Sequence, residues 1–181
     1  MSRRFRPTDA FVDESIRGRR YIMGCVLVEA RHLAQLRSTA KGLADGVAPR
    51  IHFNNDTNRQ RRRVLDAIGE MPIQVFAVIC VKGHGVTEFQ ARAMCVTEIV
   101  ERLQGRRVAK LVIESRQNDL DDARTITVAR SPEPRLVFEH RTARHEQILW
   151  IADAVTWAAG SGPRWSERLG STLEGVYEVR P

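Results

Sequence analysis

Several apolar stretches of this chain carry a carboxylate at their end or in their middle. The acids are Asp13 and Glu14 after residues 10–12, Glu114 after residues 108–113, and Asp153 within residues 148–159. An ionised carboxylate is costly to bury unless it has a partner. Acids this far apart in the chain, each flanked by apolar residues, predict one convergent acidic site.

Carboxylate oxygens are the ligands that Mg²⁺ and Mn²⁺ favour, together with water and substrate phosphate. Two such ions about 3.5–4 Å apart activate water and stabilise the leaving oxygen when a phosphodiester is cleaved. We therefore expect Asp13, Glu114 and Asp153 to bind Mg²⁺ or Mn²⁺, with Glu14 as a further catalytic carboxylate. The alternative for Asp153 is a core aspartate paired with an arginine.

Strands and one helix must bring these acids together. Parallel strands share one edge at their carboxyl ends, where Asp13 and Glu114 are both expected. Adjacent strand residues face opposite sides, and we expect Asp13 rather than Glu14 to face the metal. Helical spacing over residues 144–159 predicts a helix that carries Glu146, Trp150, Asp153 and Trp157 on one stripe.

The remaining pattern predicts an α/β fold with a mixed sheet and flanking helices. Residues 8–14 and 20–29 are expected to form antiparallel strands, because only a short basic turn separates them. A strand at 73–81, a helix at 87–103 and a strand at 108–114 predict a parallel pair. Further elements are expected as helices at 30–43 (ended by Gly46 and Pro49) and 58–68, a short helix and loop within 117–134, a strand at 135–140, a turn at 165–169 and an extended piece at 175–179. The whole chain, 1–181, is expected to be one domain with its core at about 8–160.

Other polar residues lie near the acids in sequence or in the predicted elements. Ser15 and Arg116 follow acids and are expected to orient a carboxylate or contact phosphate. His52 is either a packed residue or a proton shuttle at the edge of the site. His145 and Glu146 are either residues that contact the metal ligands without touching the metal, or part of the solvated first turn of a helix.

The net charge of +7 comes mainly from arginine, a residue suited to bidentate phosphate contacts. Such a charge fits a nucleic-acid partner, and it fits GC-rich coding equally well. Arg59, Arg62 and Arg63 are either a solvated helix face or a surface that binds the nucleic-acid backbone. Only 6% of residues are aromatic, and no row of them predicts stacking on single strands.

The sequence favours a cytoplasmic protein without a membrane partner. No apolar run reaches the roughly 18 residues of a membrane span, and no apolar signal core follows the basic start. Cys25, Cys80 and Cys95 are widely spaced in apolar surroundings, which predicts core residues and not a zinc or disulfide set. A homo-oligomer is possible through Trp165 and the C-terminal strand.

Three motifs together resemble a family of bacterial proteins. They are Phe11-Val12-Asp13-Glu14-Ser15 before an apolar strand, Glu114-Ser115-Arg116 at a strand end, and Gln147 followed by Ala152-Asp153 in the closing helix. With Ile51-His52-Phe53 before a basic helix, they resemble domain-of-unknown-function family 3800 over about residues 10–159.

The resemblance implies a ribonuclease H-like fold and a metal-dependent nuclease acting by a two-metal-ion mechanism. Two positions depart from the family: Ile16 replaces the glycine of its Asp-Glu-Ser-Gly signature, and Glu114 stands where aspartate is common. These departures keep open a catalytically inactive ribonuclease H-like module that binds nucleic acid or protein. The choice of DNA or RNA, and of endo- or exonucleolytic cleavage, is open as well.

Overall fold

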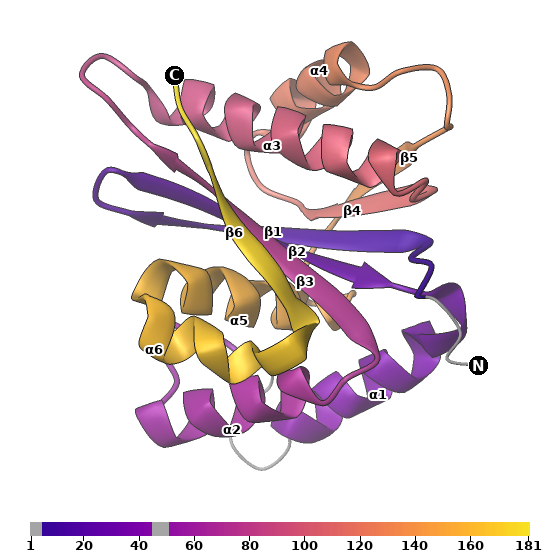
Figure 1. The fold of residues 1–181 in the computed structure, drawn as a ribbon, viewed down its shortest axis with the longest axis vertical. Coiled ribbons are helices and arrows are strands. Elements are labelled where there is room, and N and C mark those ends of the chain that lie inside the picture. Colours follow the sequence, from indigo (N-terminus) through magenta and orange to yellow (C-terminus); the bar gives the residue numbers. More distant parts are fainter. Residues whose placement is uncertain (1–4, 45–50) are drawn as a thin grey trace.

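The computed structural model describes residues 5–44 and 51–181, which form a six-stranded mixed sheet with helices on both faces (Figure 1). The strand order is β5-β4-β1-β2-β3-β6. The strands are β1 (Asp9–Arg17), β2 (Arg20–Val28), β3 (Ile73–Val81), β4 (Lys110–Glu114), β5 (Val137–Arg141) and β6 (Leu173–Val179). The helices are α1 (Leu33–Ala44), α2 (Asn58–Gly69), α3 (Glu88–Gly105), α4 (Asp119–Ala129), α5 (Ile148–Ser161) and α6 (Pro163–Ser166), with short 3₁₀ turns at Ala30–His32 and Glu167–Thr172.

These bounds confirm most of the elements expected from the pattern. Gly46 and Pro49, expected to break the chain after the first helix, lie outside the described residues. None of the helices within the described ranges is both long and apolar enough to span a membrane. Cys25, Cys80 and Cys95 are free thiols, and all three are buried, as expected of core residues.

β1 and β2 form the expected antiparallel hairpin, which turns at Gly18 with a positive φ of 57°. β1 is longer than expected, because its pairing with β2 continues to Arg17. Asp13 and Glu14 are therefore not at the end of this strand. The parallel pairing of β1 with β4 does stop at Val12 and Ile113. Asp13 and Glu114 are thus the first residues beyond that pairing, side by side at one level of the sheet.

The expected parallel orientation of residues 73–81 and 108–114 is confirmed, but the two strands are not neighbours. β3 and β4 run in the same direction, but β2 and β1 lie between them. Eight of the nine residues of β2 are buried, so both faces of this strand are covered. A strand that is apolar on both faces belongs at the centre of a sheet. The β1–β2 hairpin takes that place and moves β4 to the far side of β1.

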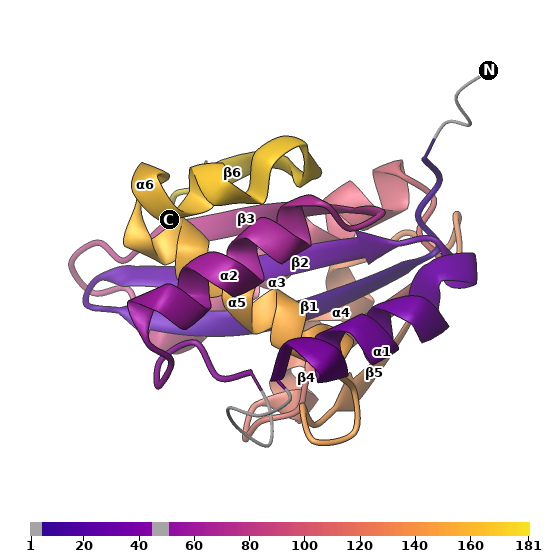
Figure 2. The ribbon, with the colours of Figure 1, turned by 90° about the horizontal axis from the view of Figure 1, so that it is seen from below.

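Alternate residues of the central strands belong to two separate hydrophobic cores, one on each face of the sheet. Phe11 and Val26 belong to the core on the side of α1, α2 and α5, which cover one face of the sheet in Figures 1 and 2. Val12 and Cys25 belong to the core under α3 and α4 on the opposite face. The two-residue period of a strand thus decides which layer each side chain meets.

α5 lies very close to the hairpin, and Gly24 makes this approach possible. A Cβ atom at Gly24 would be 2.3 Å from the Thr156 hydroxyl oxygen and 2.8 Å from the Thr156 backbone nitrogen. The Gly24 N–H donates to that hydroxyl oxygen at 3.0 Å. Gly24 is the partner of Asp13 in the β1–β2 register. The helix is therefore held directly over the level of the sheet where Asp13 lies.

α5 begins at Ile148 and not at residue 144, because residues 143–147 turn before it. Glu146 is in that turn, so it is not part of the helical stripe that the sequence predicted. Its buried carboxylate accepts from Arg37 Nε at 3.0 Å and Nη2 at 2.7 Å. Asp153 and Trp157 do lie on α5, one turn apart.

Candidate functional site

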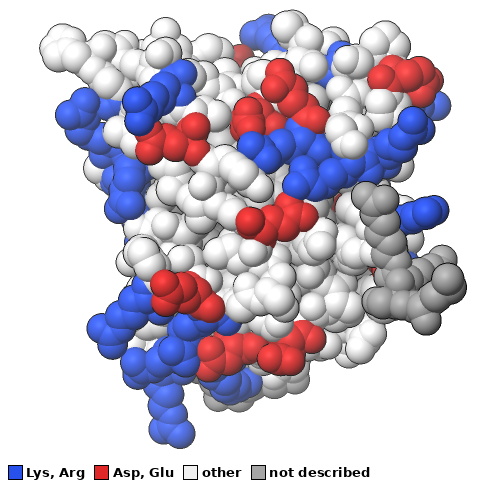
Figure 3. Space-filling model, viewed as in Figure 1, with Lys and Arg blue, Asp and Glu red and all other residues white. Residues whose placement is uncertain are grey.

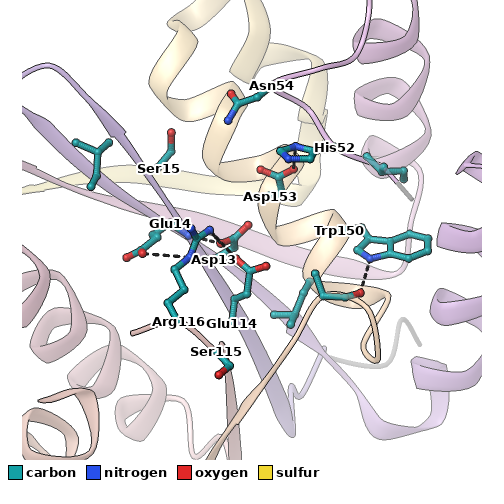
Figure 4. A pocket seen from close by; sticks show the side chains of 14 residues that line it. Asp13, Glu14, Ser15, His52, Asn54, Glu114, Ser115, Arg116, Trp150 and Asp153 are labelled. Carbon is teal, nitrogen blue, oxygen red and sulfur yellow. Dashed lines mark hydrogen bonds and ion pairs between the residues drawn. The ribbon is translucent and has the colours of Figure 1, made fainter. Parts of the chain in front are cut away.

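A pocket of about 370 Å³ opens beyond the carboxyl end of β4, beside β1 and the start of α5 (Figure 4). Its lining includes all four acids that the sequence singled out: Asp13, Glu14, Glu114 and Asp153. They come from β1, β4 and α5, and a loop at 51–54 closes the remaining side. Folding therefore gathers the acids around one space, as their apolar flanks predicted.

Asp13 and Glu14 point to opposite sides of β1. Asp13 is 4% exposed, and its Oδ1 atom accepts from the Glu14 N–H at 2.7 Å. Its side chain is turned toward the space between Glu114 and Asp153 (Figure 4). The Glu14 carboxylate contacts Arg92 and the Tyr21 hydroxyl. Strand alternation is the reason why only Asp13 of this pair is directed at the other two acids.

Asp153 forms the opposite wall of the pocket. Its Oδ2 atom accepts from the Phe53 N–H at 3.1 Å, and His52 Nδ1 lies 3.9 Å from the same oxygen. The loop at 51–54 therefore fixes the orientation of the carboxylate. His52 lines the pocket beside Asp153, a position that the proton-shuttle alternative requires.

The electrostatics of the pocket disfavour several negative charges at once. Burial raises the pKa of Asp13 well above its ordinary value, and a hydrogen bond and repulsion from Glu114 add to the effect. Burial also raises the pKa of Asp153, against the Phe53 N–H and His52, which lower it. Buried carboxylates that repel one another gain from a shared cation. The donor set, all hard carboxylate oxygen, fits Mg²⁺ or Mn²⁺.

One guanidinium, that of Arg116, is shared by three of the acids. Its Nη2 atom lies 2.6 Å from Glu114 Oε2 and 3.2 Å from Asp13 Oδ1. Its Nε atom lies 3.2 Å from Glu14 Oε1. The Arg116 side chain is 45% exposed, so this cation lies at the mouth of the pocket. The sequence placed Arg116 next to an acid, but it gave no sign that the residue bridges three.

The other residues predicted near the ligands divide into two groups. Ser15, His52 and Arg116 line the pocket. His145 does not line it, and its Nδ1 atom lies 2.9 Å from the Thr142 hydroxyl. Glu146 is bound to Arg37 and does not line it either. The arginines predicted for backbone binding, Arg59, Arg62 and Arg63, are exposed on α2 away from the pocket lining.

A buried network behind Glu14 escaped the sequence analysis. Arg92 is 3% exposed and binds Asp122 through two contacts of 2.7 Å. It also donates to the Tyr21 hydroxyl at 2.8 Å, and Asp122 lies 3.1 Å from His140 Nε2. The network holds Glu14 from behind. Asp122 and Tyr21 lie 30 and 71 residues from Arg92 in the chain, so no local pattern could reveal these contacts.

Asp119, Asp122 and His140 form the one His/Cys/Asp/Glu group, within the described ranges, whose ligand atoms all lie within 4.8 Å of one another. The polar atoms of these three side chains are already engaged in hydrogen bonds within the protein. Asp122 is bound by Arg92, and Asp119 accepts from the Ser115 hydroxyl at 2.6 Å. Asp13, Glu114 and Asp153 are spaced more widely, around a pocket that also holds the Arg116 guanidinium.

Comparison with known proteins reveals likeness in structure only. No family model and no curated protein matches the chain. The crystal structure of ribonuclease H2 from Pyrococcus horikoshii OT3 superposes with a TM-score of 0.60 and 18% identity, over 90% of this chain and 75% of that chain. Bst-RNase HIII in complex with Mn²⁺ gives a TM-score of 0.49 and 14% identity, over 83% of this chain and 50% of that chain. The first likeness confirms the ribonuclease H-like fold. Membership of domain-of-unknown-function family 3800 stays a prediction.

Proposed function

We propose that this chain is a metal-dependent nuclease that hydrolyses phosphodiester bonds of nucleic acid with Mg²⁺ or Mn²⁺. The observation that carries the proposal is the convergence of Asp13, Glu114 and Asp153, from three separate elements, on one pocket. A structural neighbour that is a ribonuclease H2 supports the same direction.

The three acids would hold the metal, which when bound supplies an activated water and a Lewis acid for the leaving oxygen. The chain's own residues prepare the ligands for this role. The Glu14 N–H orients Asp13, and the Phe53 N–H orients Asp153. Preorganised ligands of this kind need little rearrangement when the cation arrives.

Glu14 and Arg116 have supporting roles in this proposal. Glu14 is fixed by Arg92 and holds Arg116 Nε, so it sets the direction of the guanidinium. Released from Asp13 and Glu114, that guanidinium would contact a phosphate oxygen at the mouth of the pocket. In this proposal His52, whose Nδ1 atom lies 3.9 Å from Asp153 Oδ2, would accept or return a proton at the same mouth.

A second candidate function is a catalytically inactive module that binds nucleic acid or protein. The observation that favours it is Arg116, because its guanidinium already contacts three of the four acids. In that case the acids would serve only to place an arginine.

Manganese titration separates the two candidates. We expect heat and a rise in melting temperature with millimolar Mn²⁺, and cleavage of labelled RNA, DNA or RNA–DNA hybrid that EDTA abolishes. Asp153→Asn should abolish cleavage and weaken the heat signal. The control is Asp66→Asn, which changes an exposed acid on α2 that pairs with Arg168. This variant should retain both the cleavage and the heat signal. A wild-type chain that gives neither heat nor thermal shift would favour the inactive module.

A further inference from the structure

Beyond the acid pocket, a second charged cluster lies at the far end of α5. It consists of Arg17, Arg20 and Arg61. Arg17 Nη1 donates to the Ser161 hydroxyl at 2.6 Å, and Arg20 Nη2 donates to the Gly160 carbonyl at 3.1 Å. Arg61 reaches the same place from α2. The cluster therefore joins the β1–β2 hairpin, the end of α5 and α2.

The Trp157 ring holds two of these arginines. The Cζ atom of Arg61 lies 4.5 Å from the ring centroid, and that of Arg17 lies 5.2 Å from it. Trp157 is itself packed against Phe53 at 5.5 Å and Trp165 at 4.9 Å between ring centroids. A guanidinium over an indole face is attracted by the ring quadrupole. The two cations are thus placed on a rigid aromatic support.

The charges of this cluster are not balanced. None of its three arginines forms an ion pair with a carboxylate in residues 5–44 and 51–181. Burial, then the charges of Arg20 and Arg61, lower the pKa of the Arg17 guanidinium, whereas the charge of Asp153 acts in the opposite direction. Some other arginines of the fold have acidic partners, among them Arg37, Arg92, Arg106, Arg116 and Arg168. What distinguishes the cluster is that its three unpaired arginines lie together around Trp157 and the end of α5. In the described part of the chain only longer-range attraction acts on these charges, from Asp153 on Arg17 and between Asp56 and Arg61, so the three guanidinium groups keep an excess of positive charge that favours an external anion.

The position of the cluster relative to the acids follows from the helix. Asp153, Trp157 and Ser161 succeed one another at four-residue intervals, so they lie near one face of α5. A rise of 1.5 Å per residue places Trp157 about 6 Å, and Ser161 about 12 Å, from Asp153 along the axis. A nucleic-acid strand carries one phosphate per roughly 3.4 Å of axis. The cluster is therefore a few nucleotides from the acid pocket.

We propose that Arg17, Arg20 and Arg61 form a phosphate-binding subsite for the nucleic-acid strand that extends from the acid pocket along α5. The identity of the anion as nucleic acid rests on the proposed function. On the face drawn in Figure 3, further basic side chains gather at the lower left, over α6 and the start of α2. They would add long-range attraction, whereas the three clustered arginines make the contacts.

The test is binding without metal, so that cleavage does not enter. Fluorescence anisotropy of a labelled single strand and a labelled RNA–DNA hybrid is measured in EDTA at several salt concentrations. The variant Arg17→Gln/Arg20→Gln is compared with Arg124→Gln/Arg180→Gln, which removes the same charge from exposed positions on α4 and after β6. Each lost phosphate contact reduces the slope of log K against log salt by about 1.

We expect the cluster variant to bind more weakly, with a slope smaller by about 2, while the control keeps the wild-type slope. Equal slopes for the two double variants, or no binding by the wild type in EDTA, would overturn the subsite. If the double variant unfolds at a lower temperature than the wild type, the single change Arg20→Gln replaces it. Arg20 is exposed and its side chain makes one hydrogen bond, and its loss should still lower the slope by about 1. Binding through the cluster without any metal-dependent cleavage would reject the nuclease and keep the subsite.

Discussion

Replacing Arg116 by glutamine should tighten metal binding. The guanidinium of Arg116 contacts Asp13 and Glu114, two of the three expected ligands. A divalent cation can reach these oxygens only if the guanidinium leaves them. The energy of those contacts is therefore subtracted from the binding energy of the metal in the wild type, and the variant avoids this loss.

The size of the effect follows from the exposure of the arginine. Two unit charges 4 Å apart attract by about 1 kcal/mol in water and by about 4 kcal/mol near a protein surface. Since the Arg116 side chain is 45% exposed, each contact belongs near the lower end, at about 0.5–1 kcal/mol. The two contacts together give about 1–2 kcal/mol, which corresponds to roughly 5–30-fold tighter binding.

Calorimetric titration with MnCl₂ at pH 8 measures this directly, because the carboxylates are more fully ionised at this pH. Arg168→Gln is the control, since Arg168 pairs with Asp66 away from the pocket. A dissociation constant for Arg116→Gln equal to or weaker than that of the wild type would refute the reasoning. If the released guanidinium contacts phosphate, the same variant should bind Mn²⁺ more tightly and yet cleave more slowly.

Three further predictions concern stability. Because the pKa of Asp13 is raised, the metal-free native state retains a proton that the unfolded chain has released, and stability falls as pH rises from about 3.8 through the raised value. Asp13→Asn should remove this slope in thermal melts and raise Tm at pH 7, by about 2–4 °C per kcal/mol relieved. Asp122→Asn removes one of the two acids that the buried Arg92 contacts, the other being Glu14, and should cost about 1–3 kcal/mol in urea unfolding. A loss below about 1 kcal/mol would show that the pair is dispensable. Gly24→Ala places a methyl group against Thr156 and should cost at least about 1–3 kcal/mol and weaken the Mn²⁺ response, whereas an unchanged Tm would contradict the close approach of α5.

Local patterns were sufficient to predict the parts of the site that depend on local geometry. The β1–β2 hairpin followed from two apolar runs and a short turn, and it is confirmed. Strand alternation selected Asp13 over Glu14 as the residue directed at the other acids. Apolar flanks predicted that Glu114 and Asp153 would lie near Asp13, because an ionised carboxylate in an apolar segment is costly to bury without a partner.

The parts that escaped depend on contacts between distant residues. The place of β4 beside β1 was missed, because it follows from the central position of the β1–β2 hairpin and not from the sequence of β4 itself. Glu146 was assigned to a helix, since its spacing fits one, but its partner Arg37 is 109 residues away. Arg92 was missed for the same reason, as its acid comes from α4 and its tyrosine from β2, both distant from it in the chain.

Arg61 connects the two ends of the candidate site. Its Nε and Nη2 atoms donate to the carbonyls of Phe53 and Asn54 at 2.8 and 3.1 Å, and the Phe53 N–H in turn holds Asp153. Arg61, which would bind a phosphate in the proposed subsite, thus also holds the loop that orients Asp153. If a phosphate drew Arg61 away from these carbonyls, the loop that orients Asp153 would lose an anchor; binding at the two ends would then be coupled, and linkage requires that such coupling be reciprocal. In a nuclease with this arrangement, the binding of the nucleic-acid strand and the binding of the metal ion would each strengthen or weaken the other.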